Sequence, residues 1–536
     1  MTGMQTTPRR STASPERKFQ LWPPRMSWDP TGAVDKVIGV IRNVVRSLAP
    51  ASLWRNHRMF TIVACLSILP RFVAAMGFKP ALLIQDSFSY MSQSIHLQLG
   101  QLRPAGYPMM LRILEPFHSL LLVTTIQHIM GIGLGVMIYV ILRTRGLPAW
   151  GATLAAVPTL FDSRQIWLES SILPDTLFTV VLMIAVAILI VRTKPGIREA
   201  VVVGLLVAYA SVIRGNGAPV FVVILAFLLI RRVGWRVITA SVAAFAVPLL
   251  GYAFWFHGVY GQFNITNSSG LFLWSRTMSF ANCSIIKPPP DLVPLCPENQ
   301  PEHPAGPTAA WSIDAVMNQR TPAEYLWDSG VWYEHDAHPG VNAYNDKLAM
   351  QFAERAILAQ PLDYLKTVGE GVFLTFFATD RPNDYLSDHF TVQPHVHGLA
   401  HWMYFWENKY AHTEENTHPH QPWAYLMFWY QSPVWFPGWV FCALFLLGFG
   451  FIVKRWRRGW GQYAALAWTV GVVNLVVPIA AHELDYRYAL SSVPFACLAF
   501  ALALNRKPAP GQVELPPPAQ AVTAGADPAG PRPATA

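Results

Sequence analysis

The chain has 536 residues, of which 52% are hydrophobic and only 13% are charged, and its formal net charge is +9. Soluble domains carry about 25% charged residues, so this composition excludes an ordinary soluble protein and indicates a membrane protein. A positive charge of this size can also indicate nucleic-acid binding. The cations here lie in short clusters between apolar segments, as in the cytoplasmic loops of membrane proteins, so nucleic acid is not an expected partner.

Residues 1–56 are predicted to form a cytoplasmic N-terminus. The beginning of this segment is rich in Pro, Ser and Thr, a composition typical of disorder. The later stretch AVDKVIGVIRNVVRSL places apolar side chains along one side of a helix and Lys36, Arg42 and Arg46 along the other. This pattern predicts a basic helix on the inner membrane surface. The Pro- and Ala-rich residues 506–536 are predicted to form a disordered cytoplasmic tail.

Ten apolar segments approach the length of about 20 residues that an α-helix needs to cross a bilayer. They predict an all-α polytopic membrane protein with seven spans in residues 57–256 and three in residues 432–505. Basic clusters follow every even-numbered span, as Arg143 and Arg145 follow the second. Because cytoplasmic loops are enriched in Lys and Arg, we expect a multi-pass protein of the cell membrane with both termini in the cytoplasm. The predicted spans are 57–77, 119–142, 147–162, 174–191, 199–213, 217–230, 237–256, 433–453, 461–481 and 487–504.

Two longer connections are predicted on the outer side, residues 78–118 and residues 257–431. The second is long enough for a small folded module. Residues 345–378 within it have helical spacing interrupted at Pro361, which predicts helices at the outer membrane surface; an additional pair of inserted helices stays an open alternative. For the histidines of this connection a solvated loop is favoured over a metal site, because no HExxH or CxxC spacing is present. These are His389, His395, His397, His401, His412, His418 and His420.

Two cysteines, Cys283 and Cys296, lie close together in the outer sequence NCSIIKPPPDLVPLC. The outer compartment is oxidising and the loop between them is short and stiffened by proline, so a disulfide is favoured over two free thiols. The other cysteines, Cys65, Cys442 and Cys497, lie in predicted spans and are expected to be small buried residues.

The first outer connection holds the sequence DSFSYMSQSIHLQLGQLRPAGYPMML, which begins at Asp86. It is too polar to cross a bilayer and too apolar for a free linker, so we expect it to lie on the outer membrane surface. An acid at membrane depth costs free energy, which makes Asp86 a candidate functional carboxylate, with a helix N-cap as the structural alternative. Arg103 and Tyr107 add a cation and an aromatic ring that can stack on a sugar. An acid and a cation against the bilayer suit a lipid-linked phosphate and a polar co-substrate.

Three further outer connections carry acids or arginines at a similar depth. FDSRQIWLESSILPD holds Glu169 and Asp175, for which an ion pair with Arg164 and a helix cap, respectively, are the structural alternatives. VIRGNG places Arg214 after the fifth span, and AHELDYRYALSS places Arg487 after the ninth. The convergence of four separate connections predicts a polar site at the outer ends of the spans.

These motifs resemble a known family. Asp86 with SFSY, followed by RPAGYP and an apolar helix, is similar to the first outer loop of the GT-C membrane glycosyltransferases. The bacterial branch that it resembles is related to protein O-mannosyltransferases and aminoarabinose transferases, which depend on a phospholipid carrier. LESSILPDTLF, VIRGNG and LDYRYALSSVPF resemble later motifs of the family and follow in the same order, so that the resemblance covers about residues 57–500.

The resemblance implies a GT-C arrangement of the helices and an inverting transfer of a sugar from a polyprenyl-phosphate donor to an extracytoplasmic glycan, lipid or protein acceptor. It implies that Asp86 is the base that takes the proton of the acceptor hydroxyl. The leaving phosphate needs cations rather than a general acid. The candidates for phosphate binding are Arg103, Arg214 and Arg487, and those for substrate binding are Tyr90, Tyr107, Glu169, Asp175 and Tyr488.

Two other classes of function stay open. The first is a flippase or transporter of lipid-linked glycans, although such proteins often have internal repeats and polar residues at mid-membrane, neither of which is seen in this sequence. The second is a non-catalytic membrane scaffold of the same fold, in which Asp86 would have only a structural role. Whether a divalent cation, Mg²⁺ or Mn²⁺, helps to bind the donor phosphate is also open.

Overall fold

The computed structural model describes residues 50–192, 194–297, 322–328, 340–377, 390, 401–413, 417–457 and 460–505. The predicted basic helix before the first span, the two predicted disordered termini and the histidines at 389, 395 and 397 lie outside these residues. Nearly all of the described chain belongs to one compact unit, residues 59–536.

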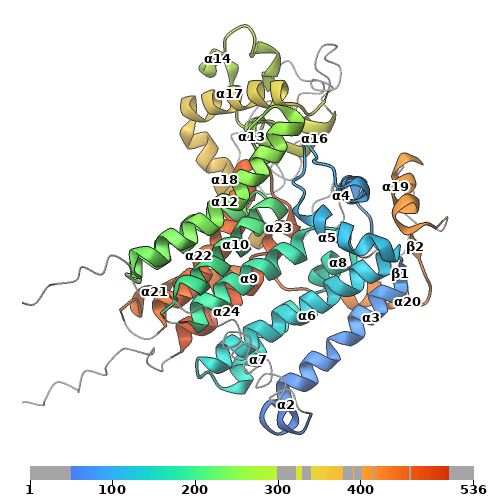
Figure 1. Cartoon of the computed structure of the whole chain (residues 1–536), viewed down its shortest axis with the longest axis vertical. Helices are drawn as coiled ribbons and strands as arrows, with labels where there is room; N and C mark the ends of the chain where they lie inside the picture. The colour runs from blue at the N-terminus through green and yellow to red at the C-terminus, as the bar shows by residue number, and fades with distance from the viewer. Residues whose placement is uncertain are drawn as a thin grey trace, which may run out of the picture. The chain divides into compact units, whose positions relative to one another are not determined.

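Helices dominate the described residues (Figure 1). Up to residue 260 they are α2 (Pro50–Leu66), α3 (Ile68–Gly77), α4 (Gln85–His96), α5 (Gly106–Leu114), the 3₁₀ helix η1 (Glu115–Phe117), α6 (Leu120–Thr144), α7 (Ala149–Phe161), α8 (Ser163–Ser170), α9 (Asp175–Val191), α10 (Ile197–Ile213), α11 (Gly217–Ile230) and α12 (Trp235–Tyr260).

The remaining helices belong to the long outer connection and to the last predicted spans. They are α13 (Ser269–Thr277), α14 (Cys283–Ile286), η2 (Val293–Leu295), α16 (Pro322–Asp328), α17 (Ala343–Ala359), α18 (Pro361–Phe377), α19 (His401–Ala411), α20 (Trp423–Gln431), α21 (Gly438–Lys454), α22 (Gly461–Ala481), α23 (Tyr486–Leu490) and α24 (Val493–Leu504). Two short strands, β1 (Phe78–Lys79) and β2 (His418–Pro419), pair antiparallel.

Five helical segments of the described chain are long and apolar enough to cross a membrane, and four shorter helices are similarly apolar. The long segments are His57–Gly77, Leu120–Thr144, Trp235–Tyr260, Gly461–Ala481 and Tyr486–Leu504; the shorter ones are α7, α9, α11 and α21. Together with α10 they coincide with the segments that the sequence predicts as spans. The all-α, membrane-type architecture is therefore confirmed, whereas the count of ten spans, their GT-C arrangement and the cytoplasmic termini stay predictions.

The outward faces of these helices are apolar, so a lipid bilayer is expected to surround them. α12 packs along α10, which in turn packs against α9 (Figure 1). Most of α12 nevertheless faces outward, and the exposed side chains include Val247, Leu250 and Phe254. Exposing a helix that is apolar on all sides to water costs free energy, whereas exposing it to hydrocarbon does not.

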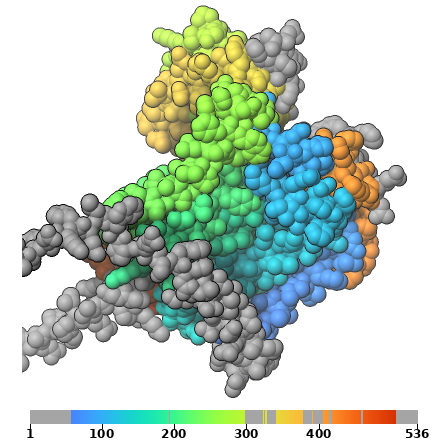
Figure 2. All heavy atoms as spheres, in the orientation of Figure 1, coloured from blue at the N-terminus to red at the C-terminus, as the bar shows by residue number. Residues whose placement is uncertain are grey.

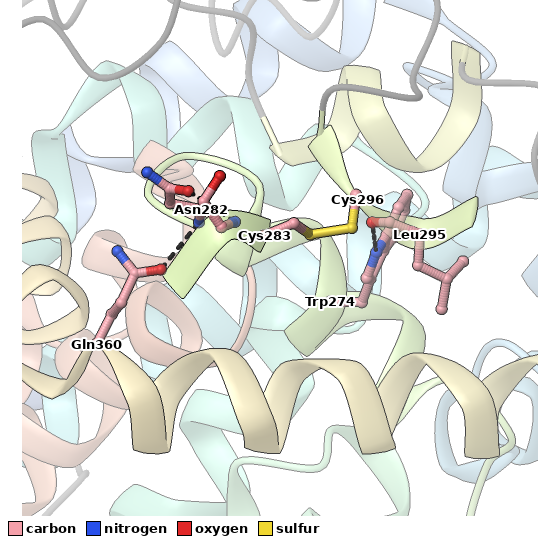
Figure 3. The surroundings of a disulfide bond; sticks show 7 residues. Trp274, Asn282, Cys283, Leu295, Cys296 and Gln360 are labelled. Carbon is pink, nitrogen blue, oxygen red and sulfur yellow. Dashed lines mark hydrogen bonds between the residues drawn. A yellow bond between two sulfur atoms is a disulfide. The ribbon is translucent and has the colours of Figure 1, made fainter. Parts of the chain in front are cut away.

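The long outer connection begins with a small hydrophobic core of its own. Trp274 of α13 is fully buried there among side chains of α14, η2, α16 and α17. Cys283 and Cys296 form the predicted disulfide, with their Cα atoms 6.1 Å apart. Figure 3 shows the Trp274 indole next to this bond, donating to the carbonyl oxygen of Leu295 at 3.0 Å. Gln360 accepts from the backbone of Asn282 at 2.8 Å and so ties the disulfide loop to the end of α17.

The later part of the long outer connection, α19 and α20, packs against helices near the start of the chain. α19 packs against α4, and α20 packs against α3. In Figure 2 the orange surface of this part lies directly against the blue surface of the first outer connection. Tyr410 of α19 is fully buried and donates to the Leu111 carbonyl oxygen at 2.8 Å. The described residues of the predicted module 257–431 thus include a disulfide-bonded core, α18, which packs against α21 and α22, and a cover in which α19 packs on α4 of the first outer connection and α20 on α3.

Candidate active site

Asp86 lies in the first turn of α4, where its carboxylate contacts two arginines. Its Oδ1 accepts from Arg103 Nη2 at 2.6 Å, and its Oδ2 lies 3.0 Å from Arg487 Nη1. The N-cap position of α4 is Ile84, whose backbone N–H donates to Ser87 Oγ at 3.0 Å. The alternative in which Asp86 caps this helix is therefore wrong, because its side chain points to the arginines instead.

Arg103 is held by the close packing of the turn that follows it. A Cβ atom on Gly106 would lie 2.4 Å from the carbonyl oxygen of Val212, so only glycine lets α5 approach the end of α10 this closely. The Arg103 guanidinium also lies over the ring of Phe272 in α13, 5.5 Å from its centroid. The first and the long outer connections therefore meet at this cation.

Arg487 is held by the start of α23. Asp485 is the N-cap of this helix, and its Oδ1 accepts from the backbone N–H of Arg487 at 3.0 Å. The other oxygen of Asp485 accepts from Arg487 Nε. The side chain of Arg487 reaches from there to Asp86 and to the Tyr488 hydroxyl, which lies 3.4 Å from Nη2. Asp485 thus fixes the orientation of the Arg487 guanidinium, which is also paired with Asp86.

A third pair, Arg214 with Asp175, lies next to the first two. Arg214 directly follows α10, and Asp175 is the first residue of α9. Arg214 Nη1 donates to Asp175 Oδ1, and its guanidinium lies over the Tyr488 ring, 4.6 Å from the centroid. Tyr488 therefore contacts both Arg214 and Arg487. The other oxygen of Asp175, Oδ2, is buried and has no hydrogen-bond partner within the described part of the chain.

The cluster balances three carboxylates against three guanidiniums. Its members are Asp86, Asp175, Asp485, Arg103, Arg214 and Arg487. Charges this deeply placed are stabilised only when they are paired. Solvent still reaches the cluster, since the side chains of Asp86 and Arg103 remain 16% and 17% exposed.

Electrostatics keep Asp86 ionised. Burial by itself raises the pKa of a carboxyl group, because it penalises the charged form. The charges of Arg103 and Arg487 outweigh this effect and lower the pKa of Asp86 from 3.8 to about 2. Asp86 is therefore a carboxylate at any physiological pH, and as long as both arginines hold it, it is a weak base.

The two tyrosines of the first outer connection, Tyr90 and Tyr107, are in contact with each other. Tyr90 of α4 is nearly buried and meets the ring of Tyr107 edge-on, with the centroids 5.2 Å apart. Tyr107 is fully buried, and its hydroxyl donates to Gln127 Oε1 at 2.8 Å. The Tyr107 ring has no exposed surface on which a sugar could stack in this structure, and its role in substrate binding stays a prediction. Tyr107 packs against the ring of Tyr90.

Glu169 is not part of this cluster. It is fully buried, and Arg71 of α3 donates to both of its carboxylate oxygens, at 2.8 and 2.9 Å. His128 Nδ1 of α6 lies 3.0 Å from Oε2, and Gln165 donates to Oε1 at 3.1 Å. The charge of Arg71 and the contact with His128 lower the pKa of Glu169 despite its burial. The suggested partner Arg164 is wrong; its guanidinium lies over the Tyr486 ring instead.

Several important contacts were not predicted from the sequence. Asp485 is visible in the motif AHELDYRYALSS, but its pairing with Arg487 is not. Arg71 and His128 are polar residues inside predicted spans, which is the available signal for a buried partner. Phe272 carries no recognisable signal, because its contact with Arg103 depends on how α13 packs.

The residues of the cluster do not fit a divalent cation as they stand. Mg²⁺ and Mn²⁺ bind through free carboxylate oxygens and water. Here every carboxylate is paired with a guanidinium, and Asp175 Oδ2 is the single unpartnered oxygen that the described residues offer at this cluster. No step that uses a metal is therefore derived at this site.

Comparison of the chain with protein-family models, with curated proteins and with solved structures finds no match.

Proposed function

We propose that this protein is an inverting membrane glycosyltransferase that moves a sugar from a polyprenyl-phosphate donor to an extracytoplasmic glycan, lipid or protein acceptor. The observation that carries the proposal is the ionised Asp86, which is paired with Arg103 and Arg487 next to a separate ion pair, Arg214 with Asp175. These groups come from four separate connections between apolar helices, and they supply the two functions that the reaction needs: a base and a phosphate site.

The reaction requires one bond to form as another breaks. The acceptor hydroxyl oxygen attacks the anomeric carbon, and the bond from that carbon to the phosphate oxygen breaks on the opposite face. Its electron pair leaves with the phosphate, while the hydroxyl proton passes to the Asp86 carboxylate. One base is sufficient, because the phosphate is a stable leaving group when cations hold its charge.

The shared arginines couple donor binding to the strength of the base. Arg103 and Arg487 hold Asp86 at a pKa of about 2. A donor phosphate competes with Asp86 for the same guanidinium groups, and each hydrogen bond that moves to the phosphate raises the pKa of Asp86. The carboxylate therefore becomes a useful base only when the donor is in place, which disfavours proton abstraction without transfer.

The test compares wild type with Asp86→Asn at matched expression, in membranes supplied with labelled polyprenyl-phosphate sugars and a cell-envelope acceptor. Asp291→Asn is the matched control, since Asp291 is an exposed carboxylate of the long outer connection. We expect Asp86→Asn to lose a factor of about 100 or more in transfer, the effect of removing a general base. Transfer by Asp86→Asn at the wild-type rate would remove Asp86 from the mechanism.

One observation favours a second candidate, the non-catalytic scaffold. Because three carboxylates balance three guanidiniums, the six charges of the cluster cancel without any ligand. A scaffold predicts that neither wild type nor Asp86→Asn transfers sugar, and that Asp86→Asn only lowers the melting temperature, as loss of a buried ion pair does. Measuring both quantities on the same preparation separates the two candidates.

A further inference from the structure

A second group of polar side chains lies at the far end of α5, apart from the Asp86 cluster. Glu115 opens η1, His118 directly follows it, and His412 directly follows α19. One ligand atom of each side chain lies within 4.8 Å of the corresponding atoms of the other two. The imidazoles of His118 and His412 are stacked, with their centroids 3.6 Å apart. Residues almost 300 positions apart in the chain are thus brought together.

From this arrangement we infer that Glu115, His118 and His412 bind a divalent transition metal ion of the zinc class. The three side chains offer two imidazole nitrogens and one carboxylate oxygen, a ligand set that suits Zn²⁺ and discriminates against Mg²⁺ and Ca²⁺, which prefer oxygen. Around a tetrahedral zinc with bonds of about 2.0–2.1 Å, ligand atoms lie roughly 3.4 Å apart. The ligand atoms now lie within 4.8 Å of one another, so binding requires the side chains to rotate out of their stacked arrangement until these atoms come closer.

The surroundings of His118 supply an independent observation. Its Nδ1 lies 3.4 Å from the backbone carbonyl oxygen of Tyr410. A carbonyl can only accept, so this contact uses a proton on Nδ1 and leaves Nε2 as the nitrogen available to a metal. Metal-binding histidines almost always donate their other ring N–H to a carbonyl or carboxylate in this way.

The carboxylate is also held in place. Arg112 Nη1 donates to Glu115 Oε2 at 3.2 Å, which leaves the other oxygen for the ion. The same Arg112 nitrogen donates to the carbonyl oxygen of Ile95 in α4, at 2.8 Å. Two of the three ligands are thus oriented by neighbouring groups before any metal is present.

The ion would join the end of α5 to the end of α19. In Figure 1, α19 lies beside α4, the helix that carries Asp86. α5 has nine residues and so separates the metal site from the turn that holds Arg103 by roughly 13 Å, at 1.5 Å per residue. The metal would therefore stabilise the cover over the first outer connection and take no part in sugar transfer. The inference stands whether or not the proposed glycosyltransferase activity is found.

The experiment measures zinc bound to the detergent-purified full-length protein, prepared without a polyhistidine tag. The protein is equilibrated with micromolar Zn²⁺, passed over a desalting column and measured by elemental analysis. Wild type is compared with His118→Gln, with His412→Ala and with His96→Ala. His96 is the control, because it is an exposed histidine at the end of α4 and outside the group. His412 is also exposed, so its replacement should leave folding intact.

We expect His118→Gln and His412→Ala each to bind one equivalent of zinc less than wild type, whereas His96→Ala binds as much as wild type. Zn²⁺ should also raise the melting temperature of wild type and of His96→Ala, because a ligand bound only by the folded state stabilises it, but not that of His412→Ala. Undiminished zinc in either His118→Gln or His412→Ala, or no zinc in wild type, would overturn the inference.

Discussion

Gly131 offers a sharp test of the buried ion cluster around Glu169. Gly131 lies on α6, and a Cβ atom placed on it would be 1.7 Å from Glu169 Oε1. No rotation of a terminal group removes an overlap of this size while the carboxylate keeps both of its bonds to Arg71. Gly131→Ala therefore has to push Glu169 away from Arg71, or α6 away from α8.

The expected change in the free energy of unfolding combines one stabilising and two destabilising contributions. Replacing glycine by alanine inside a helix stabilises it by about 1 kcal/mol. Overpacking a filled site costs about 1–3 kcal/mol, and separating a buried charge from its partner costs about 3–5 kcal/mol. We therefore expect Gly131→Ala to lower the free energy of unfolding by roughly 3–7 kcal/mol, enough to reduce the yield of folded protein.

The matched control lies on the same helix, two residues away. A Cβ atom on Gly133 would meet no atom within 4 Å, so Gly133→Ala should be neutral or slightly stabilising. The assay is thermal unfolding of both variants and wild type in the same detergent, followed by tryptophan fluorescence. Equal melting temperatures for the two variants would refute the placement of Glu169 against α6.

Two further predictions concern charge and cross-linking. Lowering the pKa of Asp86 from 3.8 to about 2 contributes about 2 kcal/mol of stability. Because the folded-state pKa is depressed, this contribution is complete above about pH 4 and disappears as the pH falls towards 2. The difference in melting temperature between wild type and Asp86→Asn should therefore narrow over this range; a difference independent of pH would contradict the pairing. The disulfide closes a loop of 13 positions, so replacing Cys283 and Cys296 by serine should destabilise the core around Trp274 by about 3 kcal/mol. Faster proteolysis of that core in the double variant than in wild type checks this, and equal rates would contradict it.

The sequence by itself determined the class of the protein and the positions of its apolar helices. Hydropathy and helix-ending residues are local properties, so the predicted spans coincide with helices, and the interruption predicted at Pro361 coincides with the start of α18. The disulfide between Cys283 and Cys296 was also predictable, because few residues separate the two cysteines. The prediction that Asp86, Arg103 and Arg487 lie together depended on placing two connections, residues 78–118 and the one after the ninth span, on the same side of the membrane, which the distribution of Lys and Arg allowed.

Tertiary structure decided which charges pair and which surfaces remain open. Glu169 has Arg71 rather than the nearby Arg164 as its partner, because α3 packs against α8. Tyr107 is buried because α5 lies against α6, although its motif suggests a ring free for a ligand. The contact between His118 and His412 arises only when α19 folds back over the first outer connection. Such pairings join residues far apart in the chain. They depend on which helices pack together, and neither the periodicity nor the residue spacing of a single segment determines that packing.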